Sequence, residues 1–124
     1  MASVAARRVL RDRVRANRAA SAERRAVARA ARRVRTTARS LATHIIATGA
    51  DATTVKGVAS ALRTAAKKAG IKGTRTRTRR TVDGFRGRAV TAYRYTRAQV
   101  AQIAAAYKPR KAEYKAIRAA LLAA

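Results

Sequence analysis

The sequence has no cysteine and no tryptophan, and it has only one histidine, one proline and five acidic residues among 124. The absence of cysteine excludes disulfides, thiolate zinc sites and cysteine nucleophiles. His44 alone cannot build a histidine metal site or a catalytic triad, so we expect a packed or surface histidine rather than a ligand. The carboxylates are spread singly along the chain, at Asp12, Glu23, Asp51, Asp83 and Glu113. We therefore expect no enzyme, no metal and no cofactor.

Large apolar side chains are also scarce. Hydrophobic residues make up 48% of the chain, but 34 of these 60 residues are alanine, which leaves 26 that can fill a core with volume. Burying a large side chain is worth roughly 1.5–3 kcal/mol, and an alanine contributes much less. We expect one small compact module, and no apolar run is long enough to span a membrane.

The abundant feature is positive charge. There are 31 Lys and Arg against 5 Asp and Glu, which gives a formal net charge of +26, and 24 of the cations are arginine. A body this small and this basic repels itself, and a polyanion is the natural compensator. The arginine fork suits phosphates and guanine edges. The composition therefore predicts nucleic acid as the partner.

Residues 3–47 form the first predicted segment, a basic helix with a break near residues 17–21. Alanine and arginine are strong helix formers, and Ser3 can cap the start. We assign residues 1–48 to a helical arm whose first half contacts phosphates through Arg7, Arg8, Arg11 and Arg15. A stripe at helical spacing can pack on the domain, or on a second copy through residues 20–45. Its members are Val9, Ala16, Ala20, Val27, Ala31, Val34, Ala38, Leu41 and Ile45.

Residues 51–124 form the predicted compact module. Its first helix runs from a cap at residues 51–54 to Ala69, and Gly70 followed by Ile71 is a helix stop. Thr96 to Gln99 matches a capping box and opens a further helix, and Pro109 ends that helix or opens the last one. The predicted fold is α+β and mainly helical: a basic N-terminal helix followed by a helix–β-hairpin–helix–helix module. Side chains expected in its core are Val55, Val58, Ala59, Leu62, Ala66, Val100, Ile103, Ala104, Tyr107, Tyr114, Ile117 and Leu121.

Residues 73–95 form the predicted hairpin. Strict alternation of Thr and Arg from residue 74 favours a strand, and Asp83-Gly84 is a strong two-residue turn. With Val82 opposite Phe85, one face would hold apolar side chains that pack on helices. The other face would carry six guanidinium groups, and this clustering is the basis of the functional prediction, because it is tolerable only beside phosphates. The six are Arg75, Arg77, Arg79, Arg86, Arg88 and Arg94.

Residues 86–88 read Arg-Gly-Arg, a short motif that can enter a narrow A·T-rich minor groove. A helix that ends in Ala-Gly-Ile, then this motif, then a helix that closes in Ala-Tyr resembles the C-terminal DNA-binding domain of Lsr2-type proteins, over about residues 58–107. The resemblance implies that Arg86, Gly87 and Arg88 read the minor groove of DNA. The chain departs from that family by its inserted Thr/Arg strand at residues 72–84 and by residues 89–97.

The hairpin between helices also permits a comparison with winged-helix domains. Lys67 and Lys68 could then contact phosphates from the helix before the hairpin. The tyrosines, Tyr93, Tyr95, Tyr107 and Tyr114, are expected mainly in the core, and Tyr95 alone stays a candidate for stacking on bases. We expect a double-stranded DNA-binding protein of nucleoid-associated or phage-encoded type, in the cytoplasm or in a virion. The alternatives are an RNA-binding protein, ribosome-associated or RNA-packaging, and a structural virion protein that neutralises packaged genome.

Overall fold

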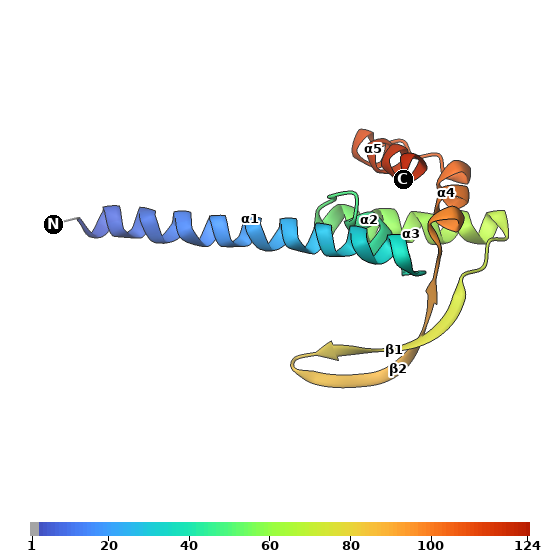
Figure 1. Cartoon of the computed structure of the whole chain (residues 1–124), viewed down its shortest axis with the longest axis horizontal. Coiled ribbons are helices and arrows are strands. Elements are labelled where there is room, and N and C mark those ends of the chain that lie inside the picture. The colour runs from blue at the N-terminus through green and yellow to red at the C-terminus, as the bar shows by residue number, and fades with distance from the viewer. Residues whose placement is uncertain (1–2) are drawn as a thin grey trace.

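The computed structural model of the chain describes residues 3–124, and residues 1 and 2 of the predicted arm lie outside this range. The described residues form five helices and one antiparallel hairpin, which confirms the α+β, mainly helical prediction. A long helix projects from a helical body, and the hairpin projects separately beneath that body (Figure 1). The elements are α1 (Val4–Thr36), α2 (Leu41–Ile46), α3 (Ala52–Ala69), β1 (Thr74–Val82), β2 (Phe85–Arg94), α4 (Arg97–Ala106) and α5 (Ala112–Ala123).

The first helix is longer and more regular than its sequence suggested. Helix α1 is unbroken over 33 residues, so the predicted break near residues 17–21 is wrong. Alanine and arginine on both sides continue the helix through this stretch, and the Ser21 side chain accepts a hydrogen bond from Arg25 one turn later. At a rise of about 1.5 Å per residue, α1 is roughly 50 Å long.

The break in the N-terminal segment lies instead at residues 37–40. Thr37 has an extended backbone, and the hydroxyl groups of Thr36 and Thr37 donate to carbonyl oxygens of the last turn of α1. The Ser40 hydroxyl then accepts from the backbone N–H of Thr43 and caps α2. Threonine and serine compete with the helix for its own hydrogen bonds, which explains why the helix ends here.

The ends of α3 follow the sequence closely. Asp51 caps its start, and its carboxylate accepts from the N–H of Thr54 at 2.8 Å. Gly70 adopts a left-handed φ of 71°, and Ile71 donates back to Ala66 at 3.0 Å. This is a Schellman ending, which glycine allows without a steric penalty. The predicted capping box of α4 is present too.

The core lies among α2, α3, α4 and α5. Ile45, Val58, Leu62 and Ile103 are fully buried within it. The core includes α2, and Ala30 in the second half of α1 is buried as well, so the second half of the predicted arm is part of the body. The first half of α1 is solvated along its whole length, including the apolar residues Val4, Val9, Leu10 and Val14.

The hairpin has the predicted turn but a different register. Asp83 and Gly84 have positive φ values of 51° and 78°, as a type I′ turn requires. Thr81 pairs with Arg86 next to the turn, but Arg79 pairs with Ala89 beyond it. Strand β2 therefore has one extra residue, a β-bulge in which residues 87 and 88 lie opposite Arg80 alone. The predicted register is correct at the turn and wrong by one residue beyond it.

The substitution Leu62→Ala tests whether the buried side chains of this small core stabilise the protein. We expect the substitution to lower the free energy of unfolding by about 2–5 kcal/mol, because it removes a fully buried side chain. Leu10→Ala is the matched control, since Leu10 is 57% exposed on the projecting half of α1 and should cost less than about 0.5 kcal/mol. Thermal and urea unfolding followed by circular dichroism measure both. Equal losses in the two variants would contradict the assigned core.

Candidate nucleic-acid interface

One short junction joins the hairpin to the helical body. Arg39, in the break after α1, forms an isolated antiparallel bridge with Tyr95 at the end of β2. The Arg39 N–H donates to the Tyr95 carbonyl at 3.0 Å, and the Tyr95 N–H donates to the Arg39 carbonyl at 2.7 Å. The Tyr95 side chain is buried in the core. The base of β2 is therefore fixed to the segment between α1 and α2.

His44 strengthens this junction. Its side chain is 4% exposed, and its Nε2 lies 2.8 Å from the Tyr95 carbonyl oxygen. Because a carbonyl only accepts, Nε2 carries the proton and donates. Burial lowers the pKa of His44 below its ordinary value of 6.5, and the neighbouring Arg97 lowers it further, against hydrogen bonding that raises it. The histidine is a packed structural residue, as one sequence interpretation expected.

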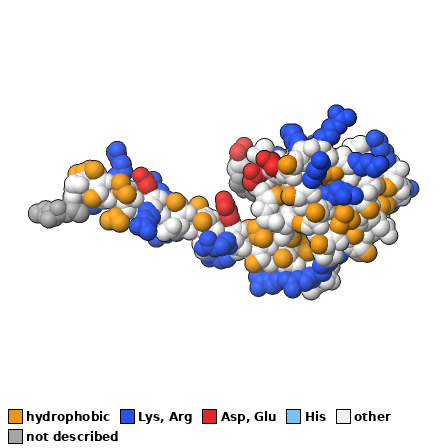
Figure 2. Space-filling view, turned by 90° about the horizontal axis from the view of Figure 1, so that it is seen from above, with side chains coloured by type: hydrophobic (Ala, Val, Ile, Leu, Met, Phe, Trp, Pro, Cys, Tyr) orange, Lys and Arg blue, Asp and Glu red, His pale blue; other side chains and the backbone are white. Residues whose placement is uncertain are grey.

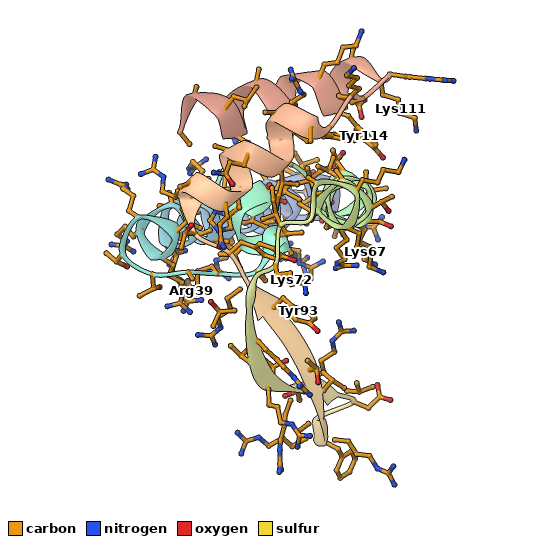
Figure 3. All side chains as sticks on the ribbon, turned by 90° about the vertical axis from the view of Figure 1, so that its right-hand side faces the viewer. Arg39, Lys67, Lys72, Tyr93, Lys111 and Tyr114 are labelled. Carbon is orange, nitrogen blue, oxygen red and sulfur yellow. The ribbon has the colours of Figure 1, made fainter. Side chains whose placement is uncertain are left out.

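The first strand is held at the same place. The Gln99 side chain, in α4, donates to the Lys72 carbonyl at 3.2 Å. A Cβ on Gly73 would lie 2.7 Å from the Arg94 carbonyl and 3.0 Å from the Tyr95 ring, so only glycine permits this approach. Beyond this base, neither strand makes extensive contact with a described helix. The ribbon projects freely into solvent (Figure 3).

The projecting ribbon is strongly basic. Between Thr74 and Arg94 it has seven arginines and one acid, Asp83, which gives a formal charge of +6. All seven guanidinium-bearing residues are exposed, and nitrogen-tipped side chains extend on both sides of the ribbon in Figure 3. They are Arg75, Arg77, Arg79, Arg80, Arg86, Arg88 and Arg94.

The bulge divides these arginines between two faces, so the prediction of six on one face is wrong. Directly opposed residues share a face, and successive residues alternate. One face carries Arg75, Arg77, Arg79 and Arg86, together with Thr81, Ala89, Thr91 and Tyr93. The other carries Arg80, Arg88 and Arg94, together with Thr74, Thr76, Thr78, Val82, Phe85, Val90 and Ala92.

Gly87 permits the bulge at this place. A Cβ at this position would lie 3.0 Å from the Arg80 carbonyl oxygen, so glycine lets the two strands approach where the extra residue sits. Arg86 and Arg88 consequently belong to opposite faces of the ribbon. The expected role of the Arg-Gly-Arg motif in the minor groove stays a prediction.

The remaining predicted contacts lie outside the hairpin. Lys67 and Lys68 are exposed in the last turn of α3, and Figure 3 shows Lys67 on the lower side of this helix, the side from which the hairpin projects. Four further arginines are exposed near the free end of α1, which Figure 2 shows as a narrow projection with interspersed basic and apolar side chains. These four are Arg7, Arg8, Arg11 and Arg15. The N-terminal end of α1, which carries them, lies far from the base of the hairpin in Figure 1.

The arginine side chains find few partners within the described chain. Arg11, Arg25 and Arg35 donate to backbone carbonyl oxygens one turn earlier on their own helix, at 3.3–3.4 Å. Arg118 bonds to the Ala104 carbonyl at 2.9 Å and joins α5 to α4. Such bonds use one or two of the five donors of a guanidinium group. The remaining donors are free to bind an external acceptor.

The aromatic residues are arranged differently from the prediction. Tyr95 is buried in the core, so it is not available for base stacking, whereas Tyr93, which was expected in the core, is 51% exposed. Phe85 and Val82, expected to pack on helices, are 78% and 61% exposed at the tip of the hairpin. Sequence reasoning missed Phe85 as a surface residue. Its place directly after the Asp-Gly turn was the signal, because the tip of a hairpin is the part that neighbours cover least.

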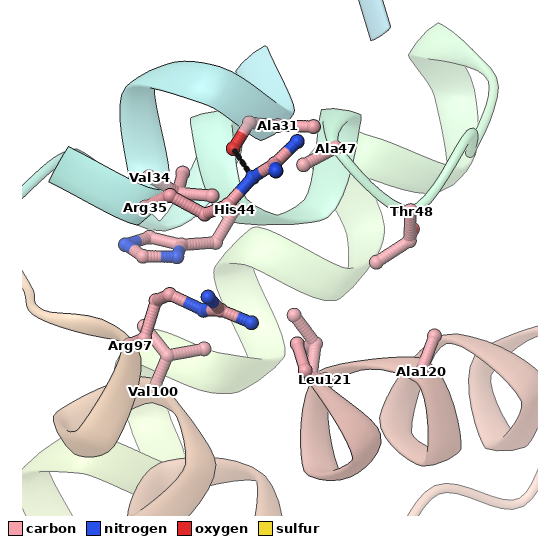
Figure 4. A pocket seen from close by; sticks show the side chains of 11 residues that line it. Ala31, Val34, Arg35, His44, Ala47, Thr48, Arg97, Val100, Ala120 and Leu121 are labelled. Carbon is pink, nitrogen blue, oxygen red and sulfur yellow. Dashed lines mark hydrogen bonds between the residues drawn. The ribbon is translucent and has the colours of Figure 1, made fainter. Parts of the chain in front are cut away.

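A pocket of about 210 Å³ lies beside the junction, between α1, α2, α4 and α5 (Figure 4). Alanine, valine and leucine form most of its wall, and Arg35, His44 and Arg97 add polar groups. The Arg35 guanidinium already bonds to the Ala31 carbonyl, and His44 bonds to Tyr95. Among residues 3–124 there is no cluster of three metal-binding side chains. The same residues contain no helix long and apolar enough to cross a membrane.

Comparison with known proteins gives no relative. No family model, curated protein or solved structure matches the chain. The resemblance to Lsr2-type domains and the comparison with winged-helix domains therefore stay predictions.

His44 provides a pH test of the junction. Since its pKa is lowered in the folded protein, the folded state binds fewer protons than the unfolded state. The stability that neutral His44 contributes is fully present above pH 6.5 and is lost as the pH falls below that value. We expect the melting temperature to fall between pH 8 and pH 5, as thermal unfolding followed by circular dichroism would measure.

His44→Gln is the control for this effect. The glutamine amide can still donate to the Tyr95 carbonyl, but it does not titrate. We expect the variant to lose less stability than the natural protein on going from pH 8 to pH 5. The same loss in both proteins would contradict the assigned role of His44.

Proposed function

We propose that the protein is a non-enzymatic double-stranded DNA-binding protein. The observation that carries the proposal is the free hairpin, on which seven exposed arginines accompany a single carboxylate. The proposal does not depend on one-face clustering, because the bulge divides the arginines between both faces. It depends on the exposure of the hairpin arginines and on guanidinium N–H groups that are free to bind an external acceptor. A ribbon with charge on both faces can contact the phosphates on both walls of a groove.

Binding through this surface is mainly electrostatic. Each arginine that neutralises a phosphate releases condensed counterions, and this release drives association at low salt. The arginines of the α1 end extend the basic surface, and α1 and the hairpin tip point in the same direction from the body in Figure 1. A duplex that runs along this direction could contact both elements. The expected role is that of a nucleoid-associated or phage-encoded protein, bound with modest preference among sequences.

RNA is the second candidate partner, and the exposed aromatic residues favour it. Tyr93 and Phe85 lie on a basic ribbon, where they could stack on unpaired bases of a structured RNA. Double-stranded DNA stays first because charge on both faces suits a continuous groove with two phosphate walls. The two candidates make different predictions in competition.

A salt titration tests the electrostatic mechanism. If 6–10 phosphates are contacted, affinity for a 30-base-pair duplex should fall by about 10³–10⁵ between 50 and 200 mM salt. Changing Arg75, Arg77, Arg79 and Arg86 to Gln should reduce the slope of log K against log salt by up to about 3.6, because each phosphate that is no longer neutralised lowers the slope by about 0.9. Fluorescence anisotropy measures the binding constants.

The matched control removes the same charge elsewhere. Lys108, Arg110, Lys111 and Lys115 are also on the surface, and Figure 3 shows Lys111 at the end of the body away from the hairpin. Changing these four residues to Gln lowers the net charge by the same amount but leaves the hairpin arginines in place. We therefore expect a smaller change in the slope of log K against log salt. Equal changes in both variants would mean that net charge, and not the hairpin, governs binding. A salt-independent affinity would overturn the proposed function.

Competition decides between the two nucleic acids. We expect a labelled duplex DNA, bound at 100 mM salt, to be displaced by unlabelled duplex DNA at lower concentration than by a stem-loop RNA of equal length. The reason is that neither groove of an A-form RNA helix offers the ribbon two close phosphate walls that its side chains can reach: the major groove is too deep and narrow for side chains, and the minor groove is wide and shallow. Preferential displacement by the RNA would replace the DNA proposal with the RNA one.

A further inference from the structure

The hairpin tip is the least expected surface of the molecule. Phe85 is the only phenylalanine in a chain that has five aromatic residues, and it is 78% exposed. Val82 pairs with it across the turn on the same face and is 61% exposed. Other exposed large apolar side chains lie on the solvated half of α1, at Val90 and Tyr93 of β2 and at Leu122, and Phe85 is the most exposed of them all. Two of them at the tip therefore call for a partner that covers them.

The length of the ribbon separates this tip from the body. Nine or ten residues at about 3.3 Å each place the turn roughly 30 Å along the ribbon from the Tyr95 junction. Figure 3 shows the lower part of the hairpin apart from the helices, and Figure 1 shows that the ribbon bends so that its turn lies below α1. No described helix covers the pair. A partner that covers Phe85 and Val82 therefore has to come from outside this fold.

The surroundings of the tip identify the chemistry of that occupant. Arg80 and Arg88 share the face of Phe85, and Arg86 lies on the opposite face beside it. An apolar partner that covered the tip would also have to accept these guanidinium groups. Stacked base pairs flanked by phosphates provide both an apolar surface and negative charge within a few ångströms.

We propose that Phe85, supported by Val82, is a wedge that inserts between adjacent base pairs of duplex DNA. Apolar side chains that act in this way enter from the minor groove, partly unstack one base step and kink the duplex. The arginines beside the tip then contact the phosphates that flank the opened step. This inference rests on the proposed function and adds to it a deformation of the DNA.

The turn itself is consistent with this role. Asp83 has a φ of 51°, a left-handed conformation that Asp and Asn adopt more readily than other residues that have a side chain. Its carboxylate is the one negative charge of the ribbon and lies next to the wedge. Asp83→Asn keeps the turn and removes repulsion of phosphates, so we expect it to bind the duplex more tightly than the natural protein.

Fluorescence provides the test. A 30-base-pair duplex with one central TA step, 2-aminopurine beside this step and a donor–acceptor pair at its ends reports unstacking and bending together. TA is the target because pyrimidine–purine steps unstack readily. We expect the natural protein to increase 2-aminopurine emission and to shorten the end-to-end distance. Phe85→Ala should lose both signals and bind roughly 5- to 150-fold more weakly, while its salt slope stays unchanged.

Two further variants keep the test decisive. Val90→Ala removes an exposed apolar side chain from the same face of the ribbon but away from the tip, and both signals should persist. Phe85→Leu keeps an apolar wedge and should retain part of the bend, which separates the loss of a wedge from a misfolded hairpin. Circular dichroism of each variant checks the fold.

The outcomes separate the wedge from the proposed function. Signals equal to those of the natural protein in Phe85→Ala, with normal DNA binding, would overturn the wedge and leave the function standing. Absence of salt-dependent DNA binding in the natural protein would overturn both. If vesicles with anionic lipid bound the natural protein more tightly than DNA and Phe85→Ala abolished this affinity, the tip would be a membrane contact and the wedge would be refuted.

Discussion

The structure depends on how one small core supports two projecting basic elements. The Tyr95 backbone is the point at which this happens, because its carbonyl oxygen accepts from both the Arg39 N–H and His44, and its ring lies in the core. The first of these donors follows α1, and the second belongs to α2. The position of the hairpin is therefore set by residues about fifty positions earlier in the chain. A change in this junction would move every arginine of the ribbon together.

Local signals in the sequence were sufficient for the ends of most elements. The Asp51 cap, the Gly70 stop and the Thr96 capping box each depend on a few adjacent residues, and the structure has all three where they were expected. The buried positions of α3 followed from helical periodicity in the same way. The end of α1 was missed because Asn17 and Ser21 are weaker breaks than two successive threonines that bond to the last helical turn.

The candidate site was harder to predict because it depends on non-local geometry. A strict Thr/Arg alternation fixes the faces of β1, but one extra residue at Gly87 reverses the faces of most of β2. Nothing in the sequence required a bulge, since glycine also fits a regular strand end. The exposure of Phe85 and the burial of Tyr95 depend on which part of the ribbon meets the helices. The backbone pairing of Arg39 with Tyr95 determines which part this is.

The bulge also changes the electrostatics of the ribbon. Six guanidinium groups on one face would lie near their neighbours at separations of about 5–8 Å, across and along the strands. Dividing the guanidinium groups between two faces increases several of these separations, because the ribbon then lies between the charges of one face and those of the other. The isolated hairpin is then less strained by repulsion than the regular register would be. Such a ribbon meets anions on both sides, which suits a groove with two walls better than a flat polyanionic surface.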